Sequence, residues 1–234
     1  MTNEARRHYD EWHRTLSSET EAEGLAPWHE AALAHVGSVS GARVLEIGCG
    51  RGSFGAHVAG GGASMLTLAD FSPAAVEVAR DRVGAGDQRG FLAADIQSLP
   101  FPDEYFDLVC SFETIEHVPS PGAAVRELVR VTRKGGRVII TSPNYLGIAG
   151  LYRVYRRLIG RPFTEMGQPI NQPLVLAWRV WLLRSLGCHV DVVDGFGHYL
   201  DLPKRLPQRI RFLDGARALT RWFALHSLTV ATRR

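Results

Sequence analysis

A glycine-rich stretch in the first quarter of the chain has the residue types of a nucleotide-binding turn. It reads Gly48-Cys49-Gly50-Arg51-Gly52 and follows a short apolar run at residues 43–47. Glycine permits backbone dihedrals and a close approach that a side chain would block, so main-chain N–H groups there can contact a ligand. The same stretch also fits a tight strand-to-helix turn that binds nothing.

Two acidic residues follow the next two predicted strands. Asp70 lies about twenty residues after the loop, where a carboxylate in nucleotide-binding sheets accepts hydrogen bonds from ribose hydroxyls. Asp95 could accept a bond from an exocyclic amine. Alone, either fits a turn or a cap, but together with the loop they indicate a pocket for an adenosine-containing ligand. The loop also comes close to the Gly-x-Gly-x-x-Gly/Ala fingerprint of nicotinamide-binding proteins, and differs from it only in having Ser53 at the last position.

A third group of polar residues lies at 111–118 and could act on a substrate. Glu113, Glu116 and His117 bring two carboxylates close to an imidazole, which can be oriented as a general base or contact a substrate. The alternative is a structural role, in which His117 only fixes the loop.

Alternating strands and helices would position these residues. We expect strands at 43–47, 65–69, 91–94, 106–110 and 137–141, and helices at 25–36, 54–58, 74–83 and 121–131. Ser72 and Pro73 have the types of an N-cap and a first helical residue. This rhythm predicts a mostly parallel sheet with helices on both faces, whose ligands bind beyond the carboxyl ends of the strands.

Composition narrows the class of protein. The 234 residues, 45% hydrophobic and 22% charged, suffice for one α/β domain with a full core. No apolar run has the length of a membrane span and the polar start has no signal-peptide pattern, so we expect a cytoplasmic protein. Three widely spaced cysteines argue against a disulfide framework and against a zinc site.

Positive charge is concentrated after residue 145, where arginine is frequent and acids are few, although the net charge is only +3. Such a bias could favour an anionic substrate, peripheral contact with a membrane, or nucleic acid. No RNA-binding signature accompanies it, so we do not expect a nucleic-acid partner.

Residues 44–52 resemble motif I of the class I S-adenosylmethionine-dependent methyltransferases. Asp70 matches their ribose-binding acid, Asp95 their adenine-contacting acid, and residues 106–111 their fourth-strand motif. The resemblance extends over about residues 25–144. It implies a three-layer Rossmann-like, doubly wound α/β sheet of about seven strands, mostly parallel with the last one antiparallel. Residues 188–193 and 224–232 would be the C-terminal strands.

The resemblance also implies a domain layout and a cofactor site. Residues 1–234 would form one methyltransferase domain, with a helical cap at 1–40 and an insertion or substrate lid at 143–173. The cofactor would be S-adenosyl-L-methionine, leaving as S-adenosyl-L-homocysteine. The residues expected to bind it are Glu46, Gly48, Cys49, Gly50, Gly52, Asp70, Phe71, Ala94, Asp95, Ile96, Ser111 and Phe112.

The Glu113–His117 stretch is similar to the Glu-x-x-Glu-His pattern of the ubiquinone-biosynthesis O-methyltransferases and their relatives. The resemblance implies that Glu113, Glu116 and His117 would be the ligands if a divalent metal is bound, and we expect His117 and Glu113 to be catalytic. The expected acceptor is a small molecule, methylated on a hydroxyl. N-methylation of a secondary metabolite or a sugar-like substrate, a NAD-dependent oxidoreductase and an inactive SAM-fold binding protein are the alternatives.

Aromatic residues outside these motifs are candidates for substrate contact. Tyr9 and Trp12 lie one turn apart on a predicted N-terminal helix, which would cover the cofactor or simply pack on the domain. Tyr145 and Tyr152 belong to the expected lid, where a basic amphipathic helix could cover the acceptor, touch a membrane or pack its apolar side on the core. Trp178 and Trp181 fit core packing of the following helix.

Overall fold

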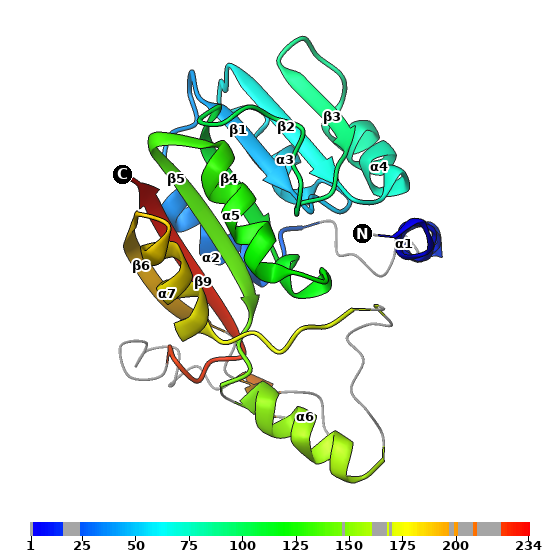
Figure 1. Ribbon diagram of the computed structural model, residues 1–234. Helices are drawn as coiled ribbons and strands as arrows, with labels where there is room; N and C mark the ends of the chain where they lie inside the picture. The colour runs from blue at the N-terminus through cyan, green and yellow to red at the C-terminus, as the bar shows by residue number, and fades with distance from the viewer. Residues whose placement is uncertain are drawn as a thin grey trace.

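A computed structural model of the chain describes residues 2–15, 24–146, 148–160, 168, 170–196, 199–200, 208–209 and 221–234. Its centre is a seven-stranded sheet in the order β3-β2-β1-β4-β5-β9-β6 (Figure 1). The strands are β1 (Arg43–Ile47), β2 (Met65–Asp70), β3 (Arg89–Ala93), β4 (Phe106–Phe112), β5 (Thr132–Pro143), β6 (Cys188–Phe196) and β9 (His226–Arg233). Neighbours from β3 to β5 pair in parallel, and β9 is antiparallel to both β5 and β6. The predicted doubly wound sheet is therefore confirmed.

Helices cover both faces of this sheet. These are α2 (Pro27–Val36), α3 (Ser53–Val58) and α4 (Pro73–Val83) on one face and α5 (Pro121–Val131) and α7 (Leu176–Ser185) on the other. The helix α1 (Asn3–Thr15) packs on α4, and α6 (Ile148–Leu158) lies beyond the ends of the strands (Figure 1). Along β1, Val44 packs in the core that includes α2 and α3, while Leu45 and Ile47 pack in the opposite core with α5 and α7. Both faces are thus buried, as a parallel sheet requires.

Most boundaries differ from the sequence expectation by a few residues. Ser72 caps α4 as predicted, because its Oγ accepts a hydrogen bond from the N–H of Ala75 at 3.2 Å. The fifth strand is longer than expected: β5 begins at Thr132 and includes the Lys134–Gly136 stretch that was expected only to stop a helix. A short hairpin of β7 (Tyr199–Leu200) and β8 (Gln208–Arg209) was not predicted.

The α6 helix presents its apolar side outward. Leu151 is 73% exposed and Leu158 80% exposed, whereas the Arg153 guanidinium lies 5.2 Å from the Tyr145 ring centroid. The expectation that the apolar side could pack on the core is therefore wrong for the described residues. Trp178 packs half-buried on the core as expected, but Trp181 is 64% exposed, which corrects its predicted core role.

Within the described residues, no helix is both long and apolar enough to cross a membrane. The cytoplasmic location stays a prediction. All three cysteines are buried and unbridged, in agreement with the absence of a disulfide framework.

Candidate active site

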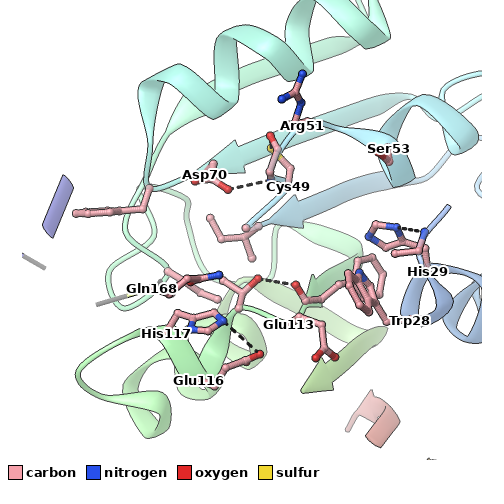
Figure 2. Close-up of a pocket in the computed structure, with 18 of the residues that line it drawn as sticks. Trp28, His29, Cys49, Arg51, Ser53, Asp70, Glu113, Glu116, His117 and Gln168 are labelled. Carbon is pink, nitrogen blue, oxygen red and sulfur yellow. Dashed lines mark hydrogen bonds and ion pairs between the residues drawn. The ribbon is translucent and has the colours of Figure 1, made fainter. Parts of the chain in front are cut away.

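A cavity of about 630 Å³ opens at the carboxyl ends of the parallel strands. Its wall includes the loop after β1, the ends of β2 and β4, and parts of α1 and α2. Figure 2 shows the part of the wall with Asp70, Glu113 and His117. A volume of this size is typical of small-molecule sites. The cavity also lies where the direction of strand connection reverses between β1 and β4, the usual ligand position in such sheets.

The glycine loop is shaped by packing as well as by its opening to the cavity. Gly48, Gly50 and Gly52 all have positive φ, at 75°, 49° and 75°. A Cβ on Gly48 would lie 2.2 Å from the Thr114 Oγ1, and one on Gly52 would lie 2.9 Å from the Ala79 Cβ. A Cβ on Gly50 would instead meet only the His13 ring, at 4.0 Å, so this residue faces open space. The middle of the loop is the part that a ligand can approach.

Asp70 is held in place at the end of β2. Its Oδ2 accepts a hydrogen bond from the Gly50 N–H at 2.9 Å, and its Oδ1 accepts one from the Ser72 N–H at 2.9 Å. Each carboxylate oxygen can accept more than one hydrogen bond, so both retain acceptor capacity. The carboxylate is therefore oriented before any ligand arrives, and Figure 2 shows it beside Cys49 at the cavity wall.

The α1 helix forms part of the cavity wall and is held there by four contacts. Asp10 accepts hydrogen bonds from the Ser72 hydroxyl and from the Ala74 N–H, which ties α1 to the start of α4. The Tyr9 hydroxyl donates to the His117 carbonyl at 3.2 Å, and its ring meets Phe71 edge-on with centroids 6.2 Å apart. Tyr9 and Trp12 both line the cavity.

His117 is a buried imidazole on the opposite wall. Its Nδ1 lies 2.9 Å from the Ile170 carbonyl. Because a carbonyl only accepts, Nδ1 carries the proton and the neutral ring keeps its lone pair on Nε2. Burial lowers the pKa of His117, and the Ile170 carbonyl and the Glu113 charge oppose that shift. His117 is thus a neutral base at neutral pH.

Glu113 has an unusual backbone and a specific partner. Its φ is 46°, a left-handed conformation that costs a non-glycine residue of the order of 1–3 kcal/mol. Its Oε2 lies 2.9 Å from the Nδ1 of His226, whereas its buried Oε1 has no hydrogen-bond partner among the described residues. The strained backbone directs this carboxylate towards the start of β9.

A buried arginine is close enough to Glu113 and Glu116 to interact with their charges. Arg179 of α7 is 1% exposed and donates hydrogen bonds to the hydroxyls of Ser142 and Ser227. Burial lowers its pKa to about 10, and the carboxylates of Glu113 and Glu116 oppose the shift. Its positive charge offsets the negative charges of Glu113 and Glu116 in the cavity wall.

The N-terminal end of α2 supplies a second imidazole. The His29 Nδ1 accepts a hydrogen bond from the Ala26 N–H at 3.3 Å, and its ring lies 5.2 Å from the Phe112 ring centroid. Burial lowers the pKa of His29 to about 4, against the opposing charge of Glu113. Trp28 lies next to it in the cavity wall, on the side of Glu113 (Figure 2).

The structure brings most of the predicted site residues to one cavity. Those that line it are Tyr9, Trp12, Gly48, Cys49, Gly50, Asp70, Phe71, Ala94, Ile96, Phe112, Glu113, Glu116 and His117. Those that do not are Glu46, Gly52, Asp95, Ser111, Tyr145 and Tyr152. Glu46 is buried behind the loop, where burial raises its pKa well above the usual value. Asp95 accepts hydrogen bonds from the N–H and side chain of Gln97.

The predicted metal ligands do not converge. Glu113 pairs with His226, while the Glu116 Oε1 lies 3.7 Å from the His117 Nε2. In the part of the chain that is described, no group of three His, Cys, Asp or Glu side chains has the arrangement of a metal site. Glu113 and Glu116 therefore lie next to different histidines, His226 and His117.

Sequence reasoning missed His226 and Arg179. His226 is more than a hundred residues from Glu113 and has no motif of its own. The predicted antiparallel strand at 224–232 was the one available signal, because the first residues of such a strand lie at the carboxyl edge of its parallel neighbours. Arg179 gave no signal, since an arginine on a helix is normally a surface residue.

Together, the strand order, the antiparallel β9, the glycine loop and the acid after β2 define a class I S-adenosylmethionine-dependent methyltransferase fold. Residues 45–140 match the family model described as a methyltransferase domain. Residues 45–140 therefore belong to the methyltransferase-domain family, and the chain as a whole is similar to class I S-adenosylmethionine-dependent methyltransferases.

Individual relatives agree with this assignment. A demethylmenaquinone methyltransferase of Clavibacter sepedonicus is 37% identical over 113 residues, covering 48% of this chain and 46% of the relative. A ubiquinone biosynthesis O-methyltransferase of Xylella fastidiosa (strain M23) is 32% identical over 169 residues, covering 68% and 65%. An S-adenosylmethionine-dependent methyltransferase structure from Mesorhizobium loti has a TM-score of 0.64 at 19% identity, over 87% of this chain and 96% of that one.

These matches have a limited extent. The chain spans about half the length of the first of these relatives and about two thirds of the second. The family model and the relatives named above are methyltransferases, which favours this activity over the nicotinamide-dependent alternative.

Proposed function

We propose that the protein transfers a methyl group from S-adenosyl-L-methionine to a hydroxyl of a small-molecule acceptor. The observation that carries this proposal is the preoriented Asp70 carboxylate beside the open Gly50 backbone. Ribose hydroxyls would donate to Asp70, and the ring of Phe71 and the side chain of Ile96 would flank the adenine. The loop and Cys49 would contact the methionine portion. The residues present therefore fit the cofactor.

His117 supports the choice of a hydroxyl acceptor. When bound, S-adenosyl-L-methionine supplies a methyl group already activated on a sulfonium, so the protein has only to align the acceptor and remove its proton. A neutral His117 with its lone pair on Nε2 can take that proton as the oxygen attacks. An amine acceptor would depend less on this base. N-methylation is the second candidate reaction.

The wider layout of the site is part of the proposal. The α1 helix would act as a cap over the cofactor, because Tyr9 and Asp10 tie it to both walls of the cavity. The relatives named above act, by their names, on demethylmenaquinone and in ubiquinone biosynthesis, which favours a small organic acceptor over a macromolecule. The segment 143–173 would cover that acceptor, which is supported by Gln168 in the cavity wall; Tyr145 and Tyr152 do not line the cavity, and residues 147, 161–167 and 169 lie outside the described part of the segment.

Calorimetric titration with S-adenosyl-L-homocysteine and with NAD tests the proposal. We expect saturable binding of S-adenosyl-L-homocysteine and none of NAD. The reverse result would refute the methyltransferase function. Cofactor binding without turnover on a broad panel of hydroxyl and amine acceptors would instead indicate a binding protein on this fold.

A further inference from the structure

The cavity wall on the β4 and β9 side contains a pair of polar side chains that the proposed chemistry does not use. Glu113 follows β4, and His226 begins β9. Adjacent strands lie about 4.8 Å apart, so β9 is about 19 Å from β2 across the sheet. The Glu113–His226 pair therefore lies beyond the part of the cavity that Asp70 assigns to the ribose.

The contacts of the pair fix the direction of the carboxylate. The His226 Nδ1 donates to the Glu113 Oε2 at 2.9 Å, since a carboxylate only accepts. The His226 ring is stacked on Phe196, with centroids 5.5 Å apart and planes 14° apart, so the imidazole cannot swing away freely. His226 thereby positions Glu113.

The other oxygen of the carboxylate is the feature that points to a ligand. The Glu113 Oε1 is shielded from water and has no hydrogen-bond partner among the described residues. A buried acceptor of this kind is costly unless a donor reaches it, and Glu113 lines the cavity. The neighbouring wall is aromatic, with Trp28, His29 and Phe112.

We propose that the Glu113–His226 pair is an acceptor-binding subsite, which takes a flat ring bearing a hydrogen-bond donor and holds that donor on Glu113 Oε1. The inference rests on the proposed methyltransferase function and names the acceptor end of that same cavity. Glu113 contacts the acceptor, and His226 is a positioning residue.

The test uses the intact chain saturated with S-adenosyl-L-homocysteine. The probes are 2-naphthol and its methyl ether, which share a ring system and differ in the O–H donor. Binding is followed by ligand-observed NMR. We expect 2-naphthol to bind at least about ten-fold more tightly, which is the size expected for a hydrogen bond to a charged group. Glu113→Gln should remove most of this preference and leave the affinity for S-adenosyl-L-homocysteine within about two-fold.

Substitutions at His226 separate positioning from general damage. His226→Asn keeps an N–H donor at the position of Nδ1 and should retain the preference, whereas His226→Leu should lose it. His189→Gln on the exposed part of β6 is the matched control and should change nothing. A ¹⁵N NMR measurement of the His226 ring should show the proton on Nδ1 in the wild type.

Two results would overturn the subsite. One is equal binding of the two probes by the wild type. The other is loss of S-adenosyl-L-homocysteine affinity in Glu113→Gln, which would make Glu113 a ligand of the cofactor. Failure of the wild type to bind S-adenosyl-L-homocysteine at all would instead refute the proposed function.

Discussion

Asp70 combines two tasks in one side chain. It fixes the glycine loop through the Gly50 N–H and the start of α4 through the Ser72 N–H, while its carboxylate lines the cavity. A single acid thus couples the shape of the loop to the site that we propose for the ribose. Substitution there should affect ligand affinity and local structure together.

Asp70→Asn should weaken S-adenosyl-L-homocysteine binding by about 1–3 kcal/mol, because the ribose hydroxyls lose a charged acceptor. Isothermal titration calorimetry measures the effect. The amide keeps the size of the side chain, so circular dichroism should show an unchanged fold. Asp87→Asn, outside the cavity, is the control. Unaltered affinity in the Asp70 variant would remove this residue from the cofactor site.

His117 should act through its side chain alone, since its backbone carbonyl holds Tyr9 independently. His117→Ala should lower kcat by about 10²–10⁴-fold and leave S-adenosyl-L-homocysteine affinity intact. His57→Ala, at an exposed position of α3, should leave both quantities unchanged.

The pH profile adds a second measurement for His117. A base must be neutral, and burial lowers the pKa of this one, so kcat/KM should fall only at a pH below the ordinary histidine value of 6.5. Normal turnover by the alanine variant would show that another group removes the proton.

The loop after β1 and the turn after β4 depend on each other. Gly48 leaves room for Thr114, whose hydroxyl donates to the Phe112 carbonyl at 2.8 Å. The left-handed Glu113 lies between these two residues of the β4 turn. The element that binds the cofactor in our proposal and the element that holds the acceptor are therefore packed directly together.

Gly48→Ala tests this packing, with Gly41→Ala as a matched control. Both residues have φ near 70°, but a Cβ on Gly41 meets nothing within 4 Å. Gly41→Ala should cost about 1 kcal/mol of unfolding free energy from backbone strain. Gly48→Ala should cost about 1–3 kcal/mol more, because Thr114 must move. Urea unfolding measures both, and equal losses would contradict the packing argument.

The whole molecule should become less stable in mild acid because of His29. Its folded pKa of about 4 is below the unfolded value of 6.5, so the unfolded chain takes up a proton first as the pH falls. The contribution of this neutral imidazole is therefore complete above pH 6.5 and is lost between pH 6.5 and 4. The full loss is roughly 3 kcal/mol, at 1.36 kcal/mol per pKa unit.

Urea titrations at pH 7 and pH 5 measure this loss. His29→Gln should flatten the dependence of stability on pH, whereas His57→Gln, at an exposed position, should not. The buried His117 adds a slope of the same sign. An identical pH dependence in the wild type and His29→Gln would rule out His29 as a source.

The sequence by itself determined the parallel half of the sheet, the loop and the position of Asp70. Each of these depends on local signals: apolar runs with helical or strand spacing, glycines and an N-cap. Gly48, Gly50 and Asp70 were identified in this way, His117 was identified from the Glu-x-x-Glu-His pattern, and the structure places all four at one cavity.

Tertiary structure decided which polar groups meet. The sequence pattern grouped Glu113, Glu116 and His117, but the fold pairs Glu113 with His226 and brings the charge of Arg179 to bear on both acids. It also turned the apolar side of α6 outward and exposed Trp181. Such pairings depend on strand order and on burial between elements distant along the chain, and no local pattern of residue types encodes them.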